Sequence, residues 1–223
     1  MIPRVFENEN YLVMDKPALT LAVPPRFADG RKVLGLLLQA ELKRQIFPVH
    51  RLDWGVSGLI IYALNSEAHR RANGWFARGL IVKKYHAKTE RHRIDHLPME
   101  MQKFALEYSW SGQEELWVSR ILRGKKRSYL HPQGDLAKTR AVLLRCEEGN
   151  CFWSLWPLTG RPHQLRLELS RRGYPILGDV LYGSSVPLSG GEIALRCCEL
   201  DLQNVPPHER GGLPEKISLE GFL

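Results

Sequence analysis

An aspartate in a short polar segment is the first group in this chain able to do chemistry. Residues 49–63 read VHRLDWGVSGLIIYA, which places Asp53 just after a histidine and an arginine. A carboxylate can act as a nucleophile or a general base, and a neighbouring cation keeps it ionised when a substrate covers it. The alternative is that Asp53 caps a turn, as aspartates before glycine and serine commonly do. The apolar run that follows predicts a loop leading directly into a buried strand.

Two further segments combine cationic, aromatic and polar residues. Residues 158–166 read LTGRPHQLR, and residues 173–183 read GYPILGDVLYG. An arginine and a histidine at the start of a helix form a partner for an anion or a carboxylate, although an ordinary capped helix with surface arginines has the same pattern. Residues 82–87 read VKKYHA, where Tyr85 is either a functional tyrosine or a strand residue half-buried in the core.

The order and spacing of these segments resemble the RluA-type pseudouridine synthases, which isomerise uridine in structured RNA. The two long motifs, around Asp53 and around Arg161, are the specific part of the resemblance. It implies the pseudouridine synthase catalytic fold, with Asp53 as the catalytic carboxylate and Arg161 as its partner. Arg166 is the runner-up for the partner role. Tyr85 is implied to lie against the target base and to move a proton there.

The same resemblance implies a reaction that needs neither a metal nor a cofactor. The target uridine is flipped out of its stack, with Arg51 displacing it and His50 supporting the loop. Asp53 then attacks the ribose or abstracts a sugar proton, and both routes stay open. An apolar residue of the last strand keeps the detached base in place. The substrate-binding positions implied in this way are Lys16, His50, Arg51, Arg166 and Leu195.

Three positions depart from the family pattern. The family usually has threonine at the places of Val56 and Pro162, and commonly histidine at the place of Arg196. These departures bear on substrate identity and on the geometry of the cleft. The matches span nearly the whole chain, so we expect a single catalytic domain over 1–223, with or without two lobes, and no separate N-terminal RNA-binding module.

The charge of the chain indicates a polyanionic partner such as nucleic acid, or simply a basic surface. The net charge is +8 and the isoelectric point is about 9.5. Between Arg120 and Arg145, eight basic residues accompany one acid, Asp135. We predict that this segment is a phosphate-binding loop that selects the RNA, a stem-loop of transfer RNA or ribosomal RNA. Its candidate RNA-binding residues are Lys125, Lys126, Arg127, Lys138 and Arg140.

The hydrophobic pattern predicts an α+β fold with a largely antiparallel sheet and flanking helices. The expected strands are 11–14, 59–64, 81–89, 116–121, 141–146, 151–156 and a last strand at 193–200, and the expected helices are 32–44, 65–78 and 162–172. Residues 147–150 read EEGN and predict a hairpin turn. The segment after residue 200 is rich in proline and glycine, which predicts a loop-rich tail.

The cysteines and the N-terminus bear on where the protein works. The cysteine spacing matches neither a zinc site nor a thioredoxin-like pair, so we expect reduced, mostly buried thiols. These cysteines are Cys146, Cys151, Cys197 and Cys198. The N-terminus has no signal-peptide core, and no apolar run is long enough to span a membrane, which predicts a cytoplasmic protein. No apolar surface helix requires a partner, which predicts a monomer.

Other functions stay open from the residues alone. A non-catalytic RNA-binding protein on the same fold would use the basic segment but has no need of Asp53, Tyr85 and Arg161 together. A glycoside hydrolase needs a second carboxylate across a cleft, and the nearest acids, Glu168 and Asp179, fit structural roles better. A basic α+β domain of some other role is the remaining alternative.

Overall fold

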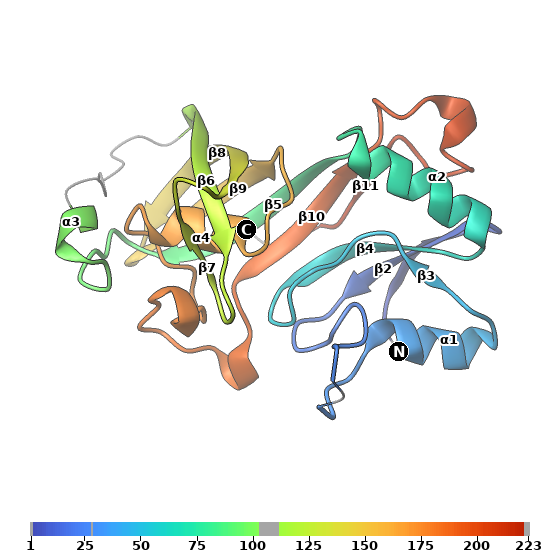
Figure 1. The fold of residues 1–223 in the computed structure, drawn as a ribbon, viewed down its shortest axis with the longest axis horizontal. Helices are drawn as coiled ribbons and strands as arrows, with labels where there is room; N and C mark the ends of the chain where they lie inside the picture. The colour runs from blue at the N-terminus through green and yellow to red at the C-terminus, as the bar shows by residue number, and fades with distance from the viewer. Residues whose placement is uncertain (1, 28, 103–111, 221–223) are drawn as a thin grey trace. The chain divides into compact units, whose positions relative to one another are not determined.

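The chain folds into two compact units, shown in the computed structural model of Figure 1. The structure describes residues 2–27, 29–102 and 112–220. The first unit comprises residues 1–83 and 196–221, and the second comprises residues 84–195 and 222–223. The chain passes between the units inside strand β5 (Val82–Glu90) and at the start of strand β10 (Leu195–Asp201). Each unit has its own buried apolar cluster.

The first unit is built around strand β4 (Ser57–Ala63), which is buried along nearly its whole length. Its other strands are β1 (Arg4–Glu7), β2 (Tyr11–Lys16), β3 (Phe47–Pro48), part of β10, and β11 (Lys216–Ser218). The main order is β1-β2-β4-β10, with β3 paired to β4 and β11 paired to β10. Among the described pairings between these strands, only β4–β10 is parallel. The sheet is therefore largely antiparallel, as predicted.

Two helices cover opposite faces of β2 and β4, as Figure 1 shows: α1 (Leu34–Leu42) and α2 (Ser66–Ala77). On one face, Leu12 and Ile60 join Leu34 of α1 in a buried cluster. On the other face, the ring of Tyr11 lies 5.5 Å from the ring of Trp75 in α2. Burial on both faces explains why β4 is a continuous apolar run instead of an alternating one.

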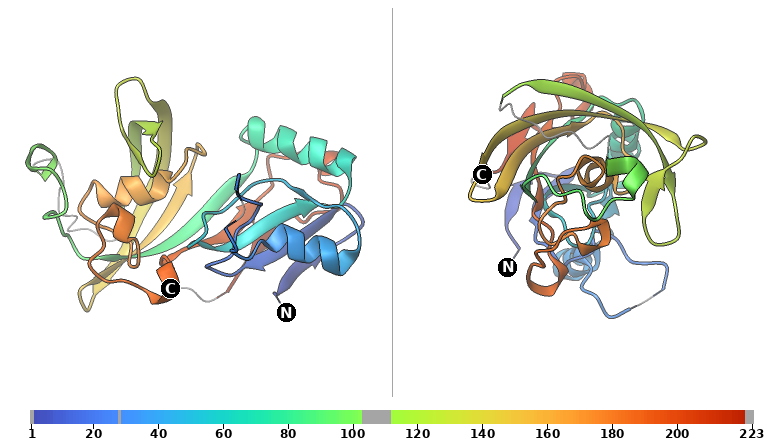
Figure 2. Two further views of the ribbon diagram at one scale, coloured as in Figure 1. Left: turned by 60° about the horizontal axis from the view of Figure 1, so that its bottom comes forward. Right: turned by 90° about the vertical axis from the view of Figure 1, so that its left-hand side faces the viewer.

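The second unit contains an antiparallel sheet with a helix on one face. Its strands are β5 from Lys84 onward, β6 (Glu114–Arg123), β7 (Ser128–Leu130), β8 (Asp135–Glu147) and β9 (Asn150–Pro157). They follow the order β5-β9-β8-β6-β7. Leu167 of helix α4 (Gln164–Ser170) packs with Ile121, Ala137 and Tyr182. In the right-hand view of Figure 2 the strands curve around α4.

Short helices complete the two units. They are α3 (Met99–Gln102), η1 (Val180–Tyr182) and η2 (Ser189–Gly191) in the second unit and η3 (Pro207–Glu209) in the first. Among the described residues, no helix combines the length and the apolar character needed to cross a membrane.

The predicted hairpin turn joins β8 to β9. Glu147 pairs with Asn150, and the two residues between them, Glu148 and Gly149, have φ angles of +49° and +76°. Two consecutive left-handed residues match the two-residue turn whose twist suits a β-hairpin. This turn confirms the prediction and sets the register of β8 against β9.

The predicted helix at 65–78 is also confirmed, together with its cap. The side chain of Asn65 accepts a hydrogen bond from the backbone N–H of Ala68 at 2.8 Å, and Gly79 follows the helix with a φ of +67°. The helix predicted at 162–172 is shorter than expected. His163 has a φ of +54°, so the helical conformation begins only at the next residue.

The prediction that β10 is the last strand is wrong. Residues 216–218 form β11, and Ile217 pairs with Leu200. Ile217 is buried between two exposed neighbours, so this strand has the alternation of a sheet edge. Three residues within a segment rich in proline and glycine carry too weak a periodic signal to be found in the sequence.

The prediction of a single basic loop is also wrong. Residues 120–145 comprise the end of β6, the strand β7 and most of β8. In β8, buried Ala137, Thr139 and Ala141 alternate with outward-facing residues, which is the pattern of a strand with one covered face. The five candidate RNA-binding residues therefore separate into a turn that contains Lys125, Lys126 and Arg127, and a strand that contains Lys138 and Arg140.

The expectation of four reduced cysteines is wrong for one pair. Cys146 and Cys151 face each other across the β8–β9 hairpin, with Cα atoms 4.1 Å apart, and form a disulfide. Cys197 and Cys198 are buried and form no disulfide, as expected. The hairpin register brings the first pair together, and the cysteine spacing by itself carried no such signal.

Candidate active site

The first unit holds Asp53 in a loop between β3 and β4. The backbone N–H of Val49 donates to the carbonyl of Ile61 at 3.2 Å, and the N–H of Val56 donates to the carbonyl of Asp53 at 3.1 Å. Asp53 is half-buried, whereas Arg51 is exposed. The loop therefore fixes the carboxylate in a hydrogen-bonded turn and leaves the arginine two residues earlier in contact with solvent.

Gly58 determines how this loop enters β4. Its φ is +112°, and a Cβ atom at this position would lie 2.2 Å from the carbonyl oxygen of Cys197, its partner on β10. Only glycine permits this conformation together with so close an approach of two backbones. The turn that carries Asp53 is thereby tied to the parallel strand β10.

His50 supports the loop from inside the first unit. Its Nε2 accepts a hydrogen bond from the N–H of Ile61 at 3.1 Å, and its ring stacks on Phe76 at 4.9 Å. Burial, and to a lesser extent the cation of Lys83, lower the pKa of His50 to about 3. The imidazole is therefore neutral at physiological pH, as its acceptor role requires.

Lys16 is the last residue of β2 and has no exposed surface. Its Nζ donates to the carbonyls of Pro17 at 2.9 Å and Thr20 at 2.7 Å. Burial lowers the pKa of Lys16 to about 8, while attraction to the Asp53 carboxylate opposes that shift. An ammonium without exposed surface does not contact a substrate directly. Lys16 therefore has the geometry of a positioning residue, which holds Asp53 and the 17–20 loop in place.

Two of the departures from the family pattern lie near this loop. Arg196 donates to Asp15 at 2.6 Å, in an ion pair between β10 and β2. Val56 is buried, with 3% of its surface exposed. A threonine here would bury a hydroxyl that needs a hydrogen-bond partner, and valine has no such requirement. The third departure, Pro162, belongs to the second unit, where its carbonyl accepts a hydrogen bond from the hydroxyl of Ser128 at 2.7 Å.

The second unit contains Tyr85 and Leu195. Tyr85 lies on β5 opposite Leu155 of β9 and has 8% of its surface exposed. By strand alternation its side chain projects from the face of the sheet that α4 covers. Leu195 begins β10 and is buried. Both residues are thus set in regular strands, which restrict their side chains.

Arg161 lies in the loop just before α4. Its backbone N–H donates to the side chain of Gln164 at 3.0 Å, its Nε donates to the carbonyl of Leu136 at 3.0 Å, and its Nη1 lies 3.6 Å from Asp135. The side chain is 37% exposed, so its guanidinium keeps access to solvent. The buried amide of Gln164 organises this loop, because it also donates to the carbonyl of Lys138 at 3.0 Å.

Arg166 is held in a buried ion pair. Its Nε and Nη2 donate to the two carboxylate oxygens of Asp179 at 2.7 and 2.8 Å. Glu168 is buried as well and contacts Arg171 and Arg172. Asp179 and Glu168, the two candidates for the second carboxylate of a glycosidase, are therefore both engaged in structural pairs.

His163 is the histidine of the pair that the sequence offered as an anion partner, and the family resemblance gave it no role of its own. Its Nδ1 lies 3.0 Å from the hydroxyl of Tyr182, and its Nε2 lies 3.4 Å from Arg123 at the end of β6. The ring therefore connects the start of α4 to the basic hairpin of β6 and β7. The left-handed backbone at His163, with a φ of +54°, is visible only in the structure.

The candidate residues divide between the two units. Lys16, His50, Arg51 and Asp53 belong to the first, and the second contains Tyr85, Arg161, Arg166 and Leu195. Within the described ranges, no three histidine, cysteine, aspartate or glutamate side chains gather as metal ligands would.

Comparisons with known proteins agree on one family. The profile of the RNA pseudouridylate synthase family matches residues 10–171. The dual-specificity RNA pseudouridine synthase RluA of Vibrio vulnificus is 29% identical over 218 residues, covering 92% of this chain and 78% of that protein. The tRNA pseudouridine synthase C of Haemophilus ducreyi is 29% identical over 187 residues, covering 80% and 73%.

A solved structure agrees on the fold. Human RNA pseudouridylate synthase domain containing 1 aligns with a TM-score of 0.68 and 21% identity, covering 91% of this chain and 78% of that one. The chain thus has the α+β pseudouridine synthase fold and belongs to the RNA pseudouridylate synthase family. It is an RNA-modifying isomerase that converts uridine to pseudouridine.

The neutral state of His50 predicts an acid-sensitive fold. The pKa of His50 in the folded chain is about 3, below the ordinary 6.5. Between these two pH values the unfolded chain binds a proton at His50 and the folded chain does not. This contribution is present above pH 6.5 and is lost as the pH falls toward 3. Between about pH 7 and about pH 5 it amounts to about 2 kcal/mol of unfolding free energy, measurable by urea unfolding.

The matched test replaces His50 by glutamine, which keeps a hydrogen-bond acceptor but does not titrate. We expect the unfolding free energy of His50→Gln to fall by about 2 kcal/mol less than that of the wild type between about pH 7 and about pH 5. His208→Gln, at an exposed histidine, should behave as the wild type does. An unaltered pH dependence in His50→Gln would contradict the account.

The buried ammonium of Lys16 predicts an alkaline limit to activity. With a pKa of about 8, Lys16 loses its proton above that pH, and Asp53 then loses a cationic neighbour. We expect Lys16→Met to lower kcat/KM at about pH 7 by about tenfold or more and to abolish the alkaline limb of the wild-type pH profile. Lys32→Met, at an exposed lysine, serves as the control. Wild-type activity and an unchanged limb in Lys16→Met would refute the positioning role.

Proposed function

We propose that Asp53 is the catalytic carboxylate of this RNA pseudouridine synthase. The placement of Asp53 in a turn closed by Gly58, beside the buried ammonium of Lys16, carries this proposal. A nearby cation favours the ionised form of a carboxylate, which is the form needed for attack or for proton abstraction. Arg161 keeps an exposed guanidinium and is proposed as the second cationic partner of Asp53 once RNA is bound.

The proposed reaction begins with the target uridine outside its stack. The exposed Arg51 takes the place of the base, at an unstacking cost that is lowest in loops. Asp53 then acts on the ribose, either by attack at carbon 1′ or by removing a sugar proton. The bond between N1 and carbon 1′ breaks, the uracil turns, and carbon 5 bonds to carbon 1′.

The second half of the reaction restores the base. The proton on carbon 5 must leave, and N1 must gain a proton. The overall change is therefore an isomerisation with no net gain or loss of atoms. Tyr85 is proposed to carry the proton from carbon 5, and Leu195 to pack on the detached base. A closed site is needed during this step, because escape of the base would leave an abasic nucleotide.

The proposed substrate is a stem-loop of transfer RNA or ribosomal RNA, modified by a monomer without metal or cofactor. The two named relatives support this range, since one is described as a dual-specificity RNA enzyme and the other as a tRNA enzyme. The exposed cations of the β6–β7 turn, Lys125, Lys126 and Arg127, are proposed to contact phosphates of that RNA.

The direct test uses purified enzyme and unmodified tRNA transcripts. We expect the wild type to form pseudouridine and Asp53→Asn to form it at least about a thousandfold more slowly, because the amide is neither a nucleophile nor a base. RNA affinity of Asp53→Asn should stay within about twofold of the wild type. Asp95→Asn, at an exposed aspartate of the second unit, is the matched control.

Two outcomes would contradict the proposal. Full activity in Asp53→Asn would remove this residue from the reaction. Release of free uracil by the wild type would indicate glycoside hydrolysis in place of isomerisation.

A further inference from the structure

The sheet of the second unit has two faces of different chemistry. Because side chains alternate along a strand, Tyr85, Ile121 and Ala137 point to the face covered by α4. The neighbouring positions on each strand point to the opposite face, called the outer face below. It is defined by its six cations, which are Lys84, Lys88, Arg120, Lys138, Arg140 and Arg145.

Two aromatic rings on the outer face are each flanked by two of these cations. The charged groups lie between 4.2 and 5.5 Å from the ring centroids. The two sets are Trp156 with Lys84 and Arg140, and Phe152 with Lys88 and Arg145. Attraction to a ring restricts a long side chain, so these cations are held above the sheet with less entropy left to lose on binding.

Few acids balance these charges among the described residues of the outer face. Glu114 lies 3.5 Å from Arg140, and Glu147 lies 3.0 Å from Arg145. Glu90, at the end of β5, instead accepts hydrogen bonds from Ser184 and Ser185. The face therefore keeps a positive excess, which a polyanion would complement.

Exposed apolar side chains lie between the cations. Leu116, Val118 and Leu136 are 58%, 51% and 39% exposed. Val118 pairs with Lys138 and Leu136 pairs with Arg120 across β6 and β8. A surface that alternates cations with apolar contacts suits a nucleic acid, whose sugars and bases pack on the apolar parts while phosphates meet the cations.

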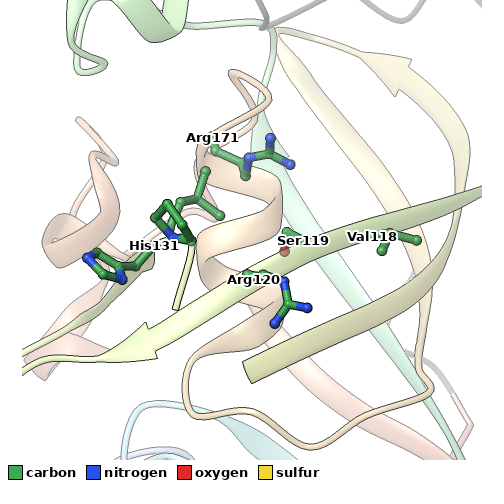
Figure 3. Close-up of a pocket in the computed structure, with 7 residues that line it drawn as sticks. Val118, Ser119, Arg120, His131 and Arg171 are labelled. Carbon is green, nitrogen blue, oxygen red and sulfur yellow. The ribbon is translucent and has the colours of Figure 1, made fainter. Parts of the chain in front are cut away.

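An open hollow continues this surface at the edge of β6, with a volume of about 310 Å³. Figure 3 shows Arg120, His131 and Arg171 around it, and none of its described lining residues is acidic. Val118 and Arg120 of the outer face line it together with Arg171 at the end of α4, so the hollow lies at the edge where the two faces meet. Arg171 also contacts the buried Glu168, so Arg120 and His131 are the groups of this hollow that best suit a phosphate.

We propose that the outer face, on the side of the sheet opposite Tyr85, and the hollow at its edge bind the phosphate backbone of the RNA substrate. This inference rests on the proposed function only in taking RNA as the substrate. The surface fixes the RNA through its backbone, so it contributes affinity and orientation and reads no sequence. An acidic protein is the competing partner for this face. A protein interface has an apolar core with few charges, whereas here cations separate the apolar side chains from one another.

The test removes two outer-face charges while leaving the other face of the sheet unchanged. We expect Lys138→Gln/Arg140→Gln to weaken binding of an unmodified tRNA transcript by about tenfold at about 0.1 M salt. The slope of log Kd against log salt should fall by about 1.5, because two phosphate contacts are lost. Lys138→Arg/Arg140→Lys retains both charges and should retain the affinity and the slope.

The matched control is Lys43→Gln/Arg44→Gln, which removes one lysine and one arginine from exposed positions of the first unit. We expect wild-type binding from this variant. Equal losses in both double variants would show a non-specific effect of net charge, and no loss in Lys138→Gln/Arg140→Gln would leave the face to a protein partner; either result overturns the inference. Binding is measured without turnover, so a chain that binds RNA through this face but forms no pseudouridine would count against the proposed function alone.

Discussion

The burial of one ammonium group organises the candidate site of the first unit. Lys16 has no exposed surface, and a charge removed from water is costly unless other groups replace its hydration. Here two carbonyls of the following loop accept its hydrogen bonds, and Asp53 supplies the opposite charge. The end of β2, the 17–20 loop and the Asp53 loop therefore form one electrostatic unit. Moving any of them would leave the ammonium uncompensated.

The second unit shows how one sheet can serve two roles. Its α4 face is fixed by buried ion pairs such as Arg166–Asp179. Because removing two charges from water is costly, such a pair defines geometry more than it adds stability. Tyr85 projects from that face and is restricted by its strand. The outer face has the opposite character, with cations held over aromatic rings and open to solvent. Period-two alternation lets strands β5, β6, β8 and β9 carry both chemistries independently.

Local signals in the sequence were sufficient for β2, β4, β5, β9 and β10, for the Asn65 cap and for the β8–β9 turn, because each depends on neighbouring residues. The motifs also indicated the family correctly. What the sequence could not show depends on register between distant segments. The approach of Gly58 to Cys197 is one example, and the disulfide across the hairpin is another. The basic segment depends on register in the same way, because only the pairing of β6 with β7 and β8 shows that it forms strands.

The central claim is that this chain forms pseudouridine in RNA through Asp53. The most direct measurement is a single-nucleotide map of pseudouridines in total RNA from cells with the intact gene, without it, and with Asp53→Ala only. The account predicts a site that disappears in both altered strains and is present in the intact one. A site that persists with Asp53→Ala but vanishes without the gene would contradict the assigned role of this carboxylate. A map identical in all three strains would contradict the claim that this chain modifies RNA under those conditions.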